Sequence, residues 1–267
     1  LPSDEVYEVE QDSFGYIWIG CDAGLFRYDG VEFKAYRHNL QSGRSISSLK
    51  IDANQRVWCQ NFSGQIFYAL GDSLHLFNNF SNSARSFPMF ELDRKNNHIW
   101  VATDTMINCF DAISNQKLYS TNKFSETFYS QSTALSIHQG EVYTMGNRIE
   151  KINTITKKQE RIDVSAFYLR YSHAFYKIDD DLIVYFYEDS RKKYQFVRMG
   201  RDCIELINTV AGELSNHFIY KIIKLGNYYA LATSDGVKLT NKRFEIIKSF
   251  LPNEKISDIL EDREGNI

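Results

Sequence analysis

Residues that could carry out chemistry are spread through this sequence without the spacing that such chemistry requires. A zinc protease needs two histidines at i and i+4, a serine hydrolase a G-x-S-x-G turn, and a nucleotide-binding enzyme a Walker loop. The sequence holds none of these, and its histidines are scattered: His38, His75, His98, His138, His173 and His217. We therefore predict no catalytic site, no metal and no cofactor, and we expect this chain not to be an enzyme.

One motif that is present, Asp12-x-x-Gly15-x-x-Trp18, is similar to the Asp-box turn of sialidase propellers. The Asp-box is spaced S-x-D-x-G-x-x-W, so the present motif is one residue longer, and no preceding serine fits. We interpret it as a structural turn, in which Asp12 caps backbone N–H groups and Gly15 takes a positive φ.

This motif belongs to a repeat, and a repeat at a fixed period is stronger evidence for a fold than any local sequence signal. The stretch Asp12–Gly30 is restated in its opening by Asp52–Trp58, 40 residues later, and in its middle by Asn96–Asp104. Three further copies lack the tryptophan and carry Tyr143, Ile183 and Ala230 in its place. A last, partial copy opens with Asp262 and Gly265 in the places of Asp12 and Gly15.

A period near 42 residues with several short strands per unit predicts an all-β fold, a β-propeller of four-stranded antiparallel blades. We expect six repeats and the start of a seventh, in one domain over residues 1–267. The approximate boundaries are 1–40, 41–80, 81–122, 123–165, 166–210, 211–252 and a partial 253–267.

The first repeat indicates how a blade is built. Its expected strands are Val6–Glu10, Tyr16–Cys21, Leu25–Tyr28 and Glu32–Tyr36, with Gly24 in one of the turns between them. The second of these strands is apolar on both faces, as a sheet between two neighbours requires. Later repeats predict a hairpin at Gly146-Asn147, a buried strand at Leu182–Tyr187, a solvated hairpin tip at Arg191-Lys192-Lys193 and a short helical connector at Thr209–Leu214.

The tryptophans Trp18, Trp58 and Trp100 could stack on sugars, but their equivalent positions inside a strand favour packing between blades. Truncating one should cost about 3–5 kcal/mol. Residues that break the repeat at loop tips are better ligand-site candidates, because the repeating residues maintain the array. No ligand-binding residue is assigned, and the candidate loops are Asn61-Phe62-Ser63, Thr103-Asp104-Thr105 and Glu188-Asp189-Ser190-Arg191.

Composition narrows the choice of partners. A net charge of −3 and a pI near 6.1 give no case for nucleic acid. No apolar window of about 18 residues exists, so we expect no membrane contact by this segment.

The cysteines Cys21, Cys59, Cys109 and Cys203 show no paired spacing and do not decide the compartment. No leader precedes Leu1, so any targeting segment is expected upstream.

The motif D-x-x-G-x-I-W-I-G-x-D-x-G-L-x-R-Y-D-G followed by F-x-x-Y, from Asp12 to Tyr36, resembles the two-component regulator propeller repeat. That resemblance implies the sensor region of a bacterial membrane-bound histidine kinase, including hybrid two-component systems. It implies a periplasmic or extracytoplasmic location in an inner-membrane protein, a homodimeric receptor, and a glycan or other small molecule as ligand. The membrane helix and kinase of such a receptor are absent here.

Three hypotheses therefore stand. The first is a ligand-sensing propeller that signals through a membrane helix, and the second is a protein-interaction scaffold without a small ligand. The third is a propeller hydrolase, which would need several carboxylates or arginines converging at the axis of the propeller.

Overall fold

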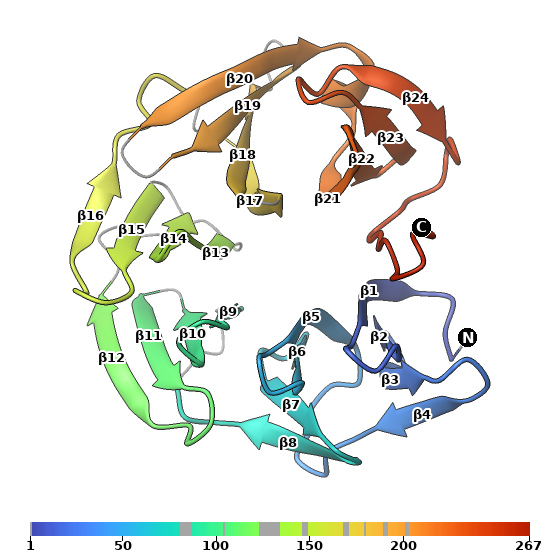
Figure 1. The fold of residues 1–267 in the computed structure, drawn as a ribbon, viewed down its shortest axis with the longest axis vertical. Helices are drawn as coiled ribbons and strands as arrows, with labels where there is room; N and C mark the ends of the chain where they lie inside the picture. Colours follow the sequence, from blue (N-terminus) through green and yellow to red (C-terminus); the bar gives the residue numbers. More distant parts are fainter. Residues whose placement is uncertain are drawn as a thin grey trace. The chain divides into compact units, whose positions relative to one another are not determined.

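The structure is a computed structural model that describes residues 2–80, 87–103, 105–122, 134–145, 149–167, 171–178, 180–188, 192–200 and 203–267. The described residues form six four-stranded sheets, and in each sheet the strands pair antiparallel in chain order (Figure 1). A meander of four strands is the form expected of a propeller blade. The chain divides into two compact units, residues 1–123 with 262–267 and residues 124–261.

The first unit contains three of the sheets. Their strands are β1 (Val6–Gln11), β2 (Ile17–Cys21), β3 (Gly24–Tyr28), β4 (Phe33–Tyr36); β5 (Ile46–Ile51), β6 (Val57–Asn61), β7 (Ile66–Leu70), β8 (Ser73–Phe77); β9 (Met89–Asp93), β10 (His98–Ala102), β11 (Met106–Asp111) and β12 (Lys117–Asn122). The C-terminal residues of this unit contact the first sheet, where the Arg263 guanidinium donates to the carbonyl of Asp12 at 2.6 Å.

The second unit contains the other three sheets and a short 3₁₀ helix. The strands are β13 (Ala134–His138), β14 (Glu141–Met145), β15 (Ile149–Asn153), β16 (Gln159–Ile162); β17 (Tyr171–Ile178), β18 (Asp181–Glu188), β19 (Lys193–Met199), β20 (Ile204–Ala211); β21 (Ile219–Leu225), β22 (Tyr228–Thr233), β23 (Gly236–Thr240) and β24 (Ile246–Phe250). The helix, η2 (Glu213–Asn216), joins the last two sheets.

The strands in the middle of each sheet are buried because both of their faces pack. In β18, Ile183 and Tyr185 pack with residues of the sixth sheet, whereas Val184 and Phe186 pack with residues of the fourth. Alternating side chains of a strand point to opposite faces, so a sheet between two neighbours needs apolar residues at every position. The predicted buried strand over Leu182–Tyr187 is confirmed.

The sheets follow the predicted repeats closely. Each lies within the residues assigned to one repeat, except that β20 extends one residue past the boundary at 210, to Ala211. The four strands expected in the first repeat are all present, with ends shifted by one residue at most. The all-β class and the four-stranded antiparallel blades are thus confirmed. A single domain over 1–267 stays a prediction.

Two local predictions differ from the structure. Thr209–Leu214 is not a helical connector throughout, because residues 209–211 still pair with β19 and only the residues from Glu213 onward form η2. The start of a seventh blade is not confirmed, because residues 251–267 contain no strand. Instead Ile259 packs against Ala230 and Ala232 of the sixth sheet. The Gly146-Asn147 hairpin and Arg191 lie outside the described residues.

Among the described residues, none of the helices has the length and apolar character needed to cross a bilayer. In the same part of the chain, no three side chains of His, Cys, Asp or Glu are grouped as metal ligands.

Candidate functional site

In the first two sheets, the repeated Asp turn lies between the first two strands. Asp12 Oδ1 accepts hydrogen bonds from the backbone N–H groups of Phe14 and Tyr16 at 2.9 and 3.0 Å, and Gly15 has a φ of +94°. Asp52 and Asp262 accept the same pair of backbone bonds, from the residues two and four positions later. These carboxylates are occupied in holding turns, so this motif has a structural role.

Two tryptophans are tied to these turns by a bond that the sequence analysis missed. The Nε1–H of Trp18 donates to Asp12 Oδ2 at 2.8 Å, and that of Trp58 donates to Asp52 Oδ2 at 2.9 Å. The signal was available, because each Asp stands six residues before its Trp. In the third sheet Asp93 stands seven residues before Trp100 and accepts instead from the side chain of Asn96.

The tryptophan rings lie in cores between neighbouring sheets. Trp18 packs in one cluster with Ile46 and Val57 of the second sheet, and Trp58 packs in another with Phe90 and Ile99 of the third. Their indoles are therefore not available to stack on a sugar. Trp100 is wholly buried too, and its ring lies 6.1 Å from that of Tyr119.

The opposite ends of the sheets in the first unit carry a different feature, a group of three aromatic rings. Tyr7 comes from β1, Phe62 from the turn between β6 and β7, and Phe87 from the segment before β9. The ring centroids of Tyr7 and Phe62 lie 4.8 Å apart, and those of Phe62 and Phe87 lie 6.4 Å apart. Phe62 is 53% exposed. We call these three residues the aromatic platform. One of the candidate loops, Asn61-Phe62-Ser63, supplies its central ring.

A partly buried hydrogen-bond network holds the turn that carries Phe62. The Asn61 side chain accepts from the Gln65 backbone N–H at 2.8 Å and donates to Gln65 Oε1 at 2.7 Å. Gln65 Nε2 then donates to the carbonyl of Leu40, in the link between the first two sheets. That link comes very close to the turn at Gly43, where a Cβ would lie 2.9 Å from the Ser63 hydroxyl. The tip is therefore fixed before any ligand arrives.

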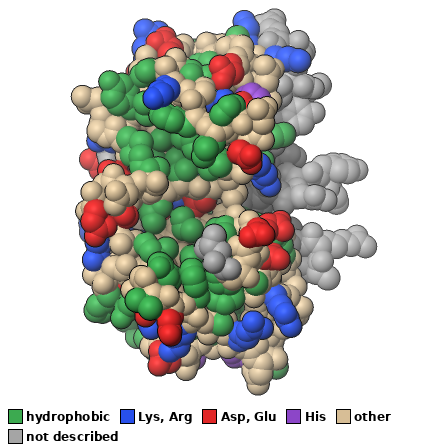
Figure 2. All heavy atoms as spheres, turned by 90° about the vertical axis from the view of Figure 1, so that its right-hand side faces the viewer, with side chains coloured by type: hydrophobic (Ala, Val, Ile, Leu, Met, Phe, Trp, Pro, Cys, Tyr) green, Lys and Arg blue, Asp and Glu red, His purple; other side chains and the backbone are tan. Residues whose placement is uncertain are grey.

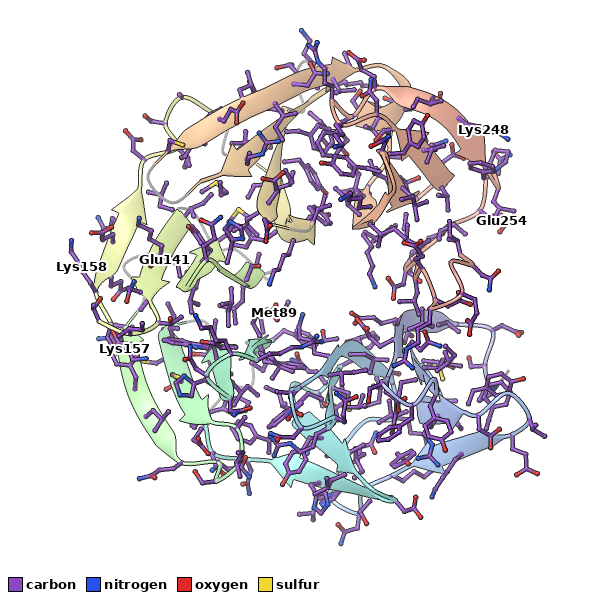
Figure 3. The ribbon with its side chains drawn as sticks, viewed as in Figure 1. Met89, Glu141, Lys157, Lys158, Lys248 and Glu254 are labelled. Carbon is purple, nitrogen blue, oxygen red and sulfur yellow. The ribbon has the colours of Figure 1, made fainter. Side chains whose placement is uncertain are left out.

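The two outer rings are placed by features of their own strands. Tyr7 is an extra residue in β1, because the register with β2 shifts between Val6 and Glu8. Such a bulge changes the direction of a side chain. On the other side, the wholly buried Gln60 donates from Nε2 to the Pro88 carbonyl, next to Phe87. Met89, at the start of the edge strand β9, follows directly (Figure 3).

The charged groups beside Tyr7 are acidic. Burial raises the pKa of the Tyr7 hydroxyl, and a hydrogen bond with Glu5 and the charges of Glu5 and Asp22 raise it further. A hydrogen bond with Ser45 acts in the opposite direction. Glu5 and Asp22 are exposed and are joined through their backbones, since the Asp22 N–H donates to the Glu5 carbonyl at 3.2 Å. The platform thus has an apolar centre and a polar, acidic margin.

Carboxylates also gather around Lys50, on the first strands of the same three sheets. The Lys50 ammonium lies 3.1 Å from a carboxylate oxygen of Glu91. Burial lowers the pKa of Lys50, but the charges of Glu91, Glu8 and Glu10 outweigh it and leave the pKa raised. The Glu8 carboxylate also accepts the backbone N–H of Leu49 at 2.8 Å. Lys50 and these three glutamates, which we call the Lys50 cluster, bring several carboxylates near one another, and Glu91 is in an ion pair with Lys50.

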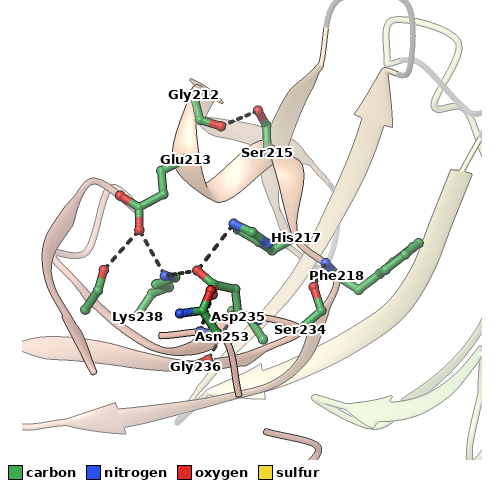
Figure 4. A network of polar contacts seen from close by, with 12 residues as sticks. Gly212, Glu213, Ser215, His217, Phe218, Ser234, Asp235, Gly236, Lys238 and Asn253 are labelled. Atoms are coloured by element: carbon green, nitrogen blue, oxygen red, sulfur yellow. Dashed lines mark hydrogen bonds and ion pairs between the residues drawn. The ribbon is translucent and has the colours of Figure 1, made fainter. Parts of the chain in front are cut away.

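In the second unit, the buried Lys238 forms the centre of a polar network (Figure 4). Its ammonium lies 2.8 Å from Asp235 and 2.9 Å from Glu213. Asp235 also accepts the backbone N–H of Asn253 and lies 3.5 Å from the ring of His217. The network joins η2, the turn between β22 and β23, and the segment after β24. We interpret it as a structural network that holds these three segments together.

The other predicted candidates are not brought together. Thr103 is buried and accepts the Met106 N–H, while Asp104 and residues 189–191 lie outside the described residues. Two of the histidines pack on aromatic rings: His38 contacts Phe67, and His75 stacks on Tyr68. Burial is the main cause that lowers the pKa of His138, which fits a packed imidazole better than a proton donor.

Residues 1–23 match the model of the two component regulator propeller family. The two component regulator propeller resemblance is thereby confirmed. The chain is also 43% identical over 47 residues to Histidine kinase P4 of Formosa agariphila, a match that covers 18% of this chain and 3% of that protein.

Solved structures extend the likeness to the whole fold. The extracellular domain of the putative hybrid two component system BT4673 from B. thetaiotaomicron superimposes with a TM-score of 0.75 at 17% identity, over 97% of this chain and 38% of that one. A streptogramin B lyase structure gives 0.75 at 13% identity, over 99% of this chain and 90% of that one. Identities this low show the fold alone, so the six sheets are the blades of a β-propeller. This chain spans well under two thirds of the kinase and of the BT4673 domain.

Proposed function

We propose that this chain is the ligand-sensing propeller of a bacterial two-component sensor, located outside the cytoplasmic membrane. The match of residues 1–23 to the two component regulator propeller family carries the proposal. The likeness to extracellular domains of hybrid two-component systems supports it, because those domains share the fold over nearly all of this chain. The ligand is a carbohydrate or another small molecule.

The sensing mechanism rests on differential binding. A ligand changes the signalling state only if it binds one arrangement of the receptor more tightly than another. In the complete receptor we expect a homodimer, in which ligand occupancy changes the arrangement of the two protomers, and a membrane helix beyond this segment carries the change to the kinase. The segment itself binds and does not catalyse.

Scanning calorimetry of the 267-residue chain against a panel of oligosaccharides and small metabolites tests the proposal. A ligand present at a hundred times its Kd stabilises the native state by about 2.7 kcal/mol, which a melting temperature reports. We expect at least one member of the panel to raise the Tm. No shift with any member at millimolar concentration would count against ligand sensing.

A protein-interaction scaffold is the alternative, and exposed apolar residues favour it. Hydrophobic side chains gather on the face shown in Figure 2, and Ile247, Phe250 and Leu251, in and after β24, are 53%, 40% and 59% exposed. Large exposed apolar patches often mark protein contacts. A tight protein partner, captured while the chain stays indifferent to small molecules, would support the scaffold instead.

The hydrolase hypothesis can be tested on the Lys50 cluster. If the chain is a binding module, it will not release chromophore from aryl glycosides, and Glu91→Gln will leave that background unchanged. Turnover that Glu91→Gln abolishes would show an enzyme.

A further inference from the structure

We infer that the aromatic platform of Tyr7, Phe62 and Phe87 binds an uncharged oligosaccharide through the apolar faces of its sugar rings. The inference rests on the proposed function and names the site and the ligand class for it. Sugar rings present C–H groups on their faces, and the negative face of an aromatic ring attracts them. Hydroxyl groups at the edges of the sugar then need polar partners.

The position of Phe62 is the first argument. Turns between the second and third strands end in a glycine in the first, second and sixth sheets, at Gly24, Gly64 and Gly236. The residue two places before that glycine is Asp22, Phe62 and Ser234 in turn. A polar residue suits an exposed turn, so a half-exposed phenylalanine is the exception. The repeat does not require it, and it contributes little to the core.

The shape of the platform is the second argument. The three rings come from three different chain segments and are tilted to each other by 53° and 60°. Phe62 is near enough to both neighbours to contact their rings, so the platform is continuous and longer than one sugar ring. A ligand that uses all of it therefore has more than one sugar unit.

The rigidity of the platform is the third argument. Asn61 and Gln65 fix the central turn, and Gln60 fixes the segment of Phe87 through the Pro88 carbonyl. Side chains that are already ordered lose little entropy on binding.

Polarity and charge select the ligand class. The Tyr7 hydroxyl and Ser45 lie at one edge of the platform and can exchange hydrogen bonds with sugar hydroxyls. Glu5 and Asp22 place negative charge at the same edge. Carboxylates disfavour uronic acids and sulfated sugars there, because like charges repel across a short distance. A neutral glycan meets no such penalty.

The test measures binding of neutral hexasaccharides (cellohexaose, xylohexaose, mannohexaose and maltohexaose) and of the anionic hexagalacturonate by isothermal titration calorimetry. It uses the 267-residue chain, Phe62→Ala, Phe87→Ala and, as a matched control, Phe14→Ala. Phe14 is 73% exposed and lies in the turn at the other end of β1. Circular dichroism and melting temperature confirm that each variant is folded.

We expect a neutral hexasaccharide to bind, Phe62→Ala to weaken it by roughly tenfold or more, as removal of a central aromatic contact does, and Phe14→Ala to leave it unchanged. Hexagalacturonate should bind more weakly than the neutral ligand. Failure of every neutral hexasaccharide at 10 mM, an unchanged affinity in Phe62→Ala and Phe87→Ala, or tighter binding of hexagalacturonate would each overturn the inference.

These failures differ from failure of the proposed function. A ligand that binds equally to the chain and to Phe62→Ala removes the platform but keeps ligand sensing. A chain that binds no member of the wider panel of oligosaccharides and metabolites loses both.

Discussion

In the first and second sheets, the turns at one end are alike in the two sheets, whereas the turns at the other end differ. At one end, Asp12 and Asp52 make the same backbone and indole hydrogen bonds in turns of the same length. At the other end, the turns differ in length and carry Asp22 in one sheet and the exposed Phe62 in the next. The repeating end stabilises the blade, and the varying end is free to bind.

The largest expected effect is on the repeating end, in Asp52→Ala. This carboxylate accepts bonds from Arg56 Nε at 2.6 Å and from the Trp58 indole, and Arg56 is buried. Removing it leaves a buried guanidinium without its counter-ion, which costs about 3–5 kcal/mol. Urea unfolding measures the loss. Asp262→Ala is the matched control, because there the neutral Asn266 stands in the place of Arg56 and donates to the carboxylate at 2.9 Å. Equal losses in the two variants would contradict this explanation.

A smaller effect is expected in the second unit, where several tyrosines pack between the fifth and sixth sheets. The Tyr176 hydroxyl donates to the Ile219 carbonyl at 2.7 Å and so joins the fifth and sixth sheets. Tyr176→Phe should lose about 1 kcal/mol of unfolding free energy. Tyr185→Phe should lose less, because its hydroxyl lies 3.4 Å from the same carbonyl. Thermal unfolding distinguishes them, and a reversed order would show that this bond does not join the sheets.

The sixth sheet sharpens the comparison, because its turn between β22 and β23, at the varying end, has a structural role. Asp235 in this turn pairs with Lys238. Hydrogen bonding to Lys238 is the main cause that lowers the pKa of Asp235 and of Glu213. A lowered carboxylate pKa contributes stability that is present above its unfolded value, about 4, and is lost as the pH falls through the folded pKa.

We therefore expect the stability difference between the wild type and Lys238→Met to be full near neutral pH and to shrink below about pH 4. Urea midpoints between pH 3 and 7 measure it. A difference that stays constant over that range would show that the ion pairs do not stabilise this turn.

The smallest expected effect on stability is that of Phe62→Ala. The ring is half-exposed at a loop tip, so its removal should change the unfolding free energy by no more than about 0.5 kcal/mol. Phe67→Ala is the contrasting variant, because Phe67 lies five residues later and is wholly buried. Its loss should be about 3–5 kcal/mol. A large loss in Phe62→Ala would make the aromatic platform part of the core.

The fold could be predicted because its signals are local and repeated. Trp18 and Trp58 mark the same strand of two blades, and the apolar run at Leu182–Tyr187 marks a strand that packs on both faces. The seventh blade could not be decided in this way. Asp262 and Gly265 do form the repeated turn, yet the segment before them finds no strand to pair with and lies on the sixth sheet.

The candidate site was only partly visible in the sequence. The rule that repeat-breaking loop tips are free for function gave Asn61-Phe62-Ser63 as one of three candidate loops and assigned no residue. It could not select Tyr7 or Phe87, because their contacts with Phe62 join residues far apart in the chain. The bulge that places Tyr7 depends on the pairing of β1 with β2, and no residue type in β1 predicts it.

Amide hydrogen exchange of the chain, with and without a bound neutral hexasaccharide, tests most directly whether ligand binds at the varying ends. We predict added protection at the start of β1, in the turn between β6 and β7 and at the start of β9, with the turns of Asp12 and Asp52 unchanged. Protection confined to the Asp turns or to the Lys238 network, with none around Phe62, would contradict the account.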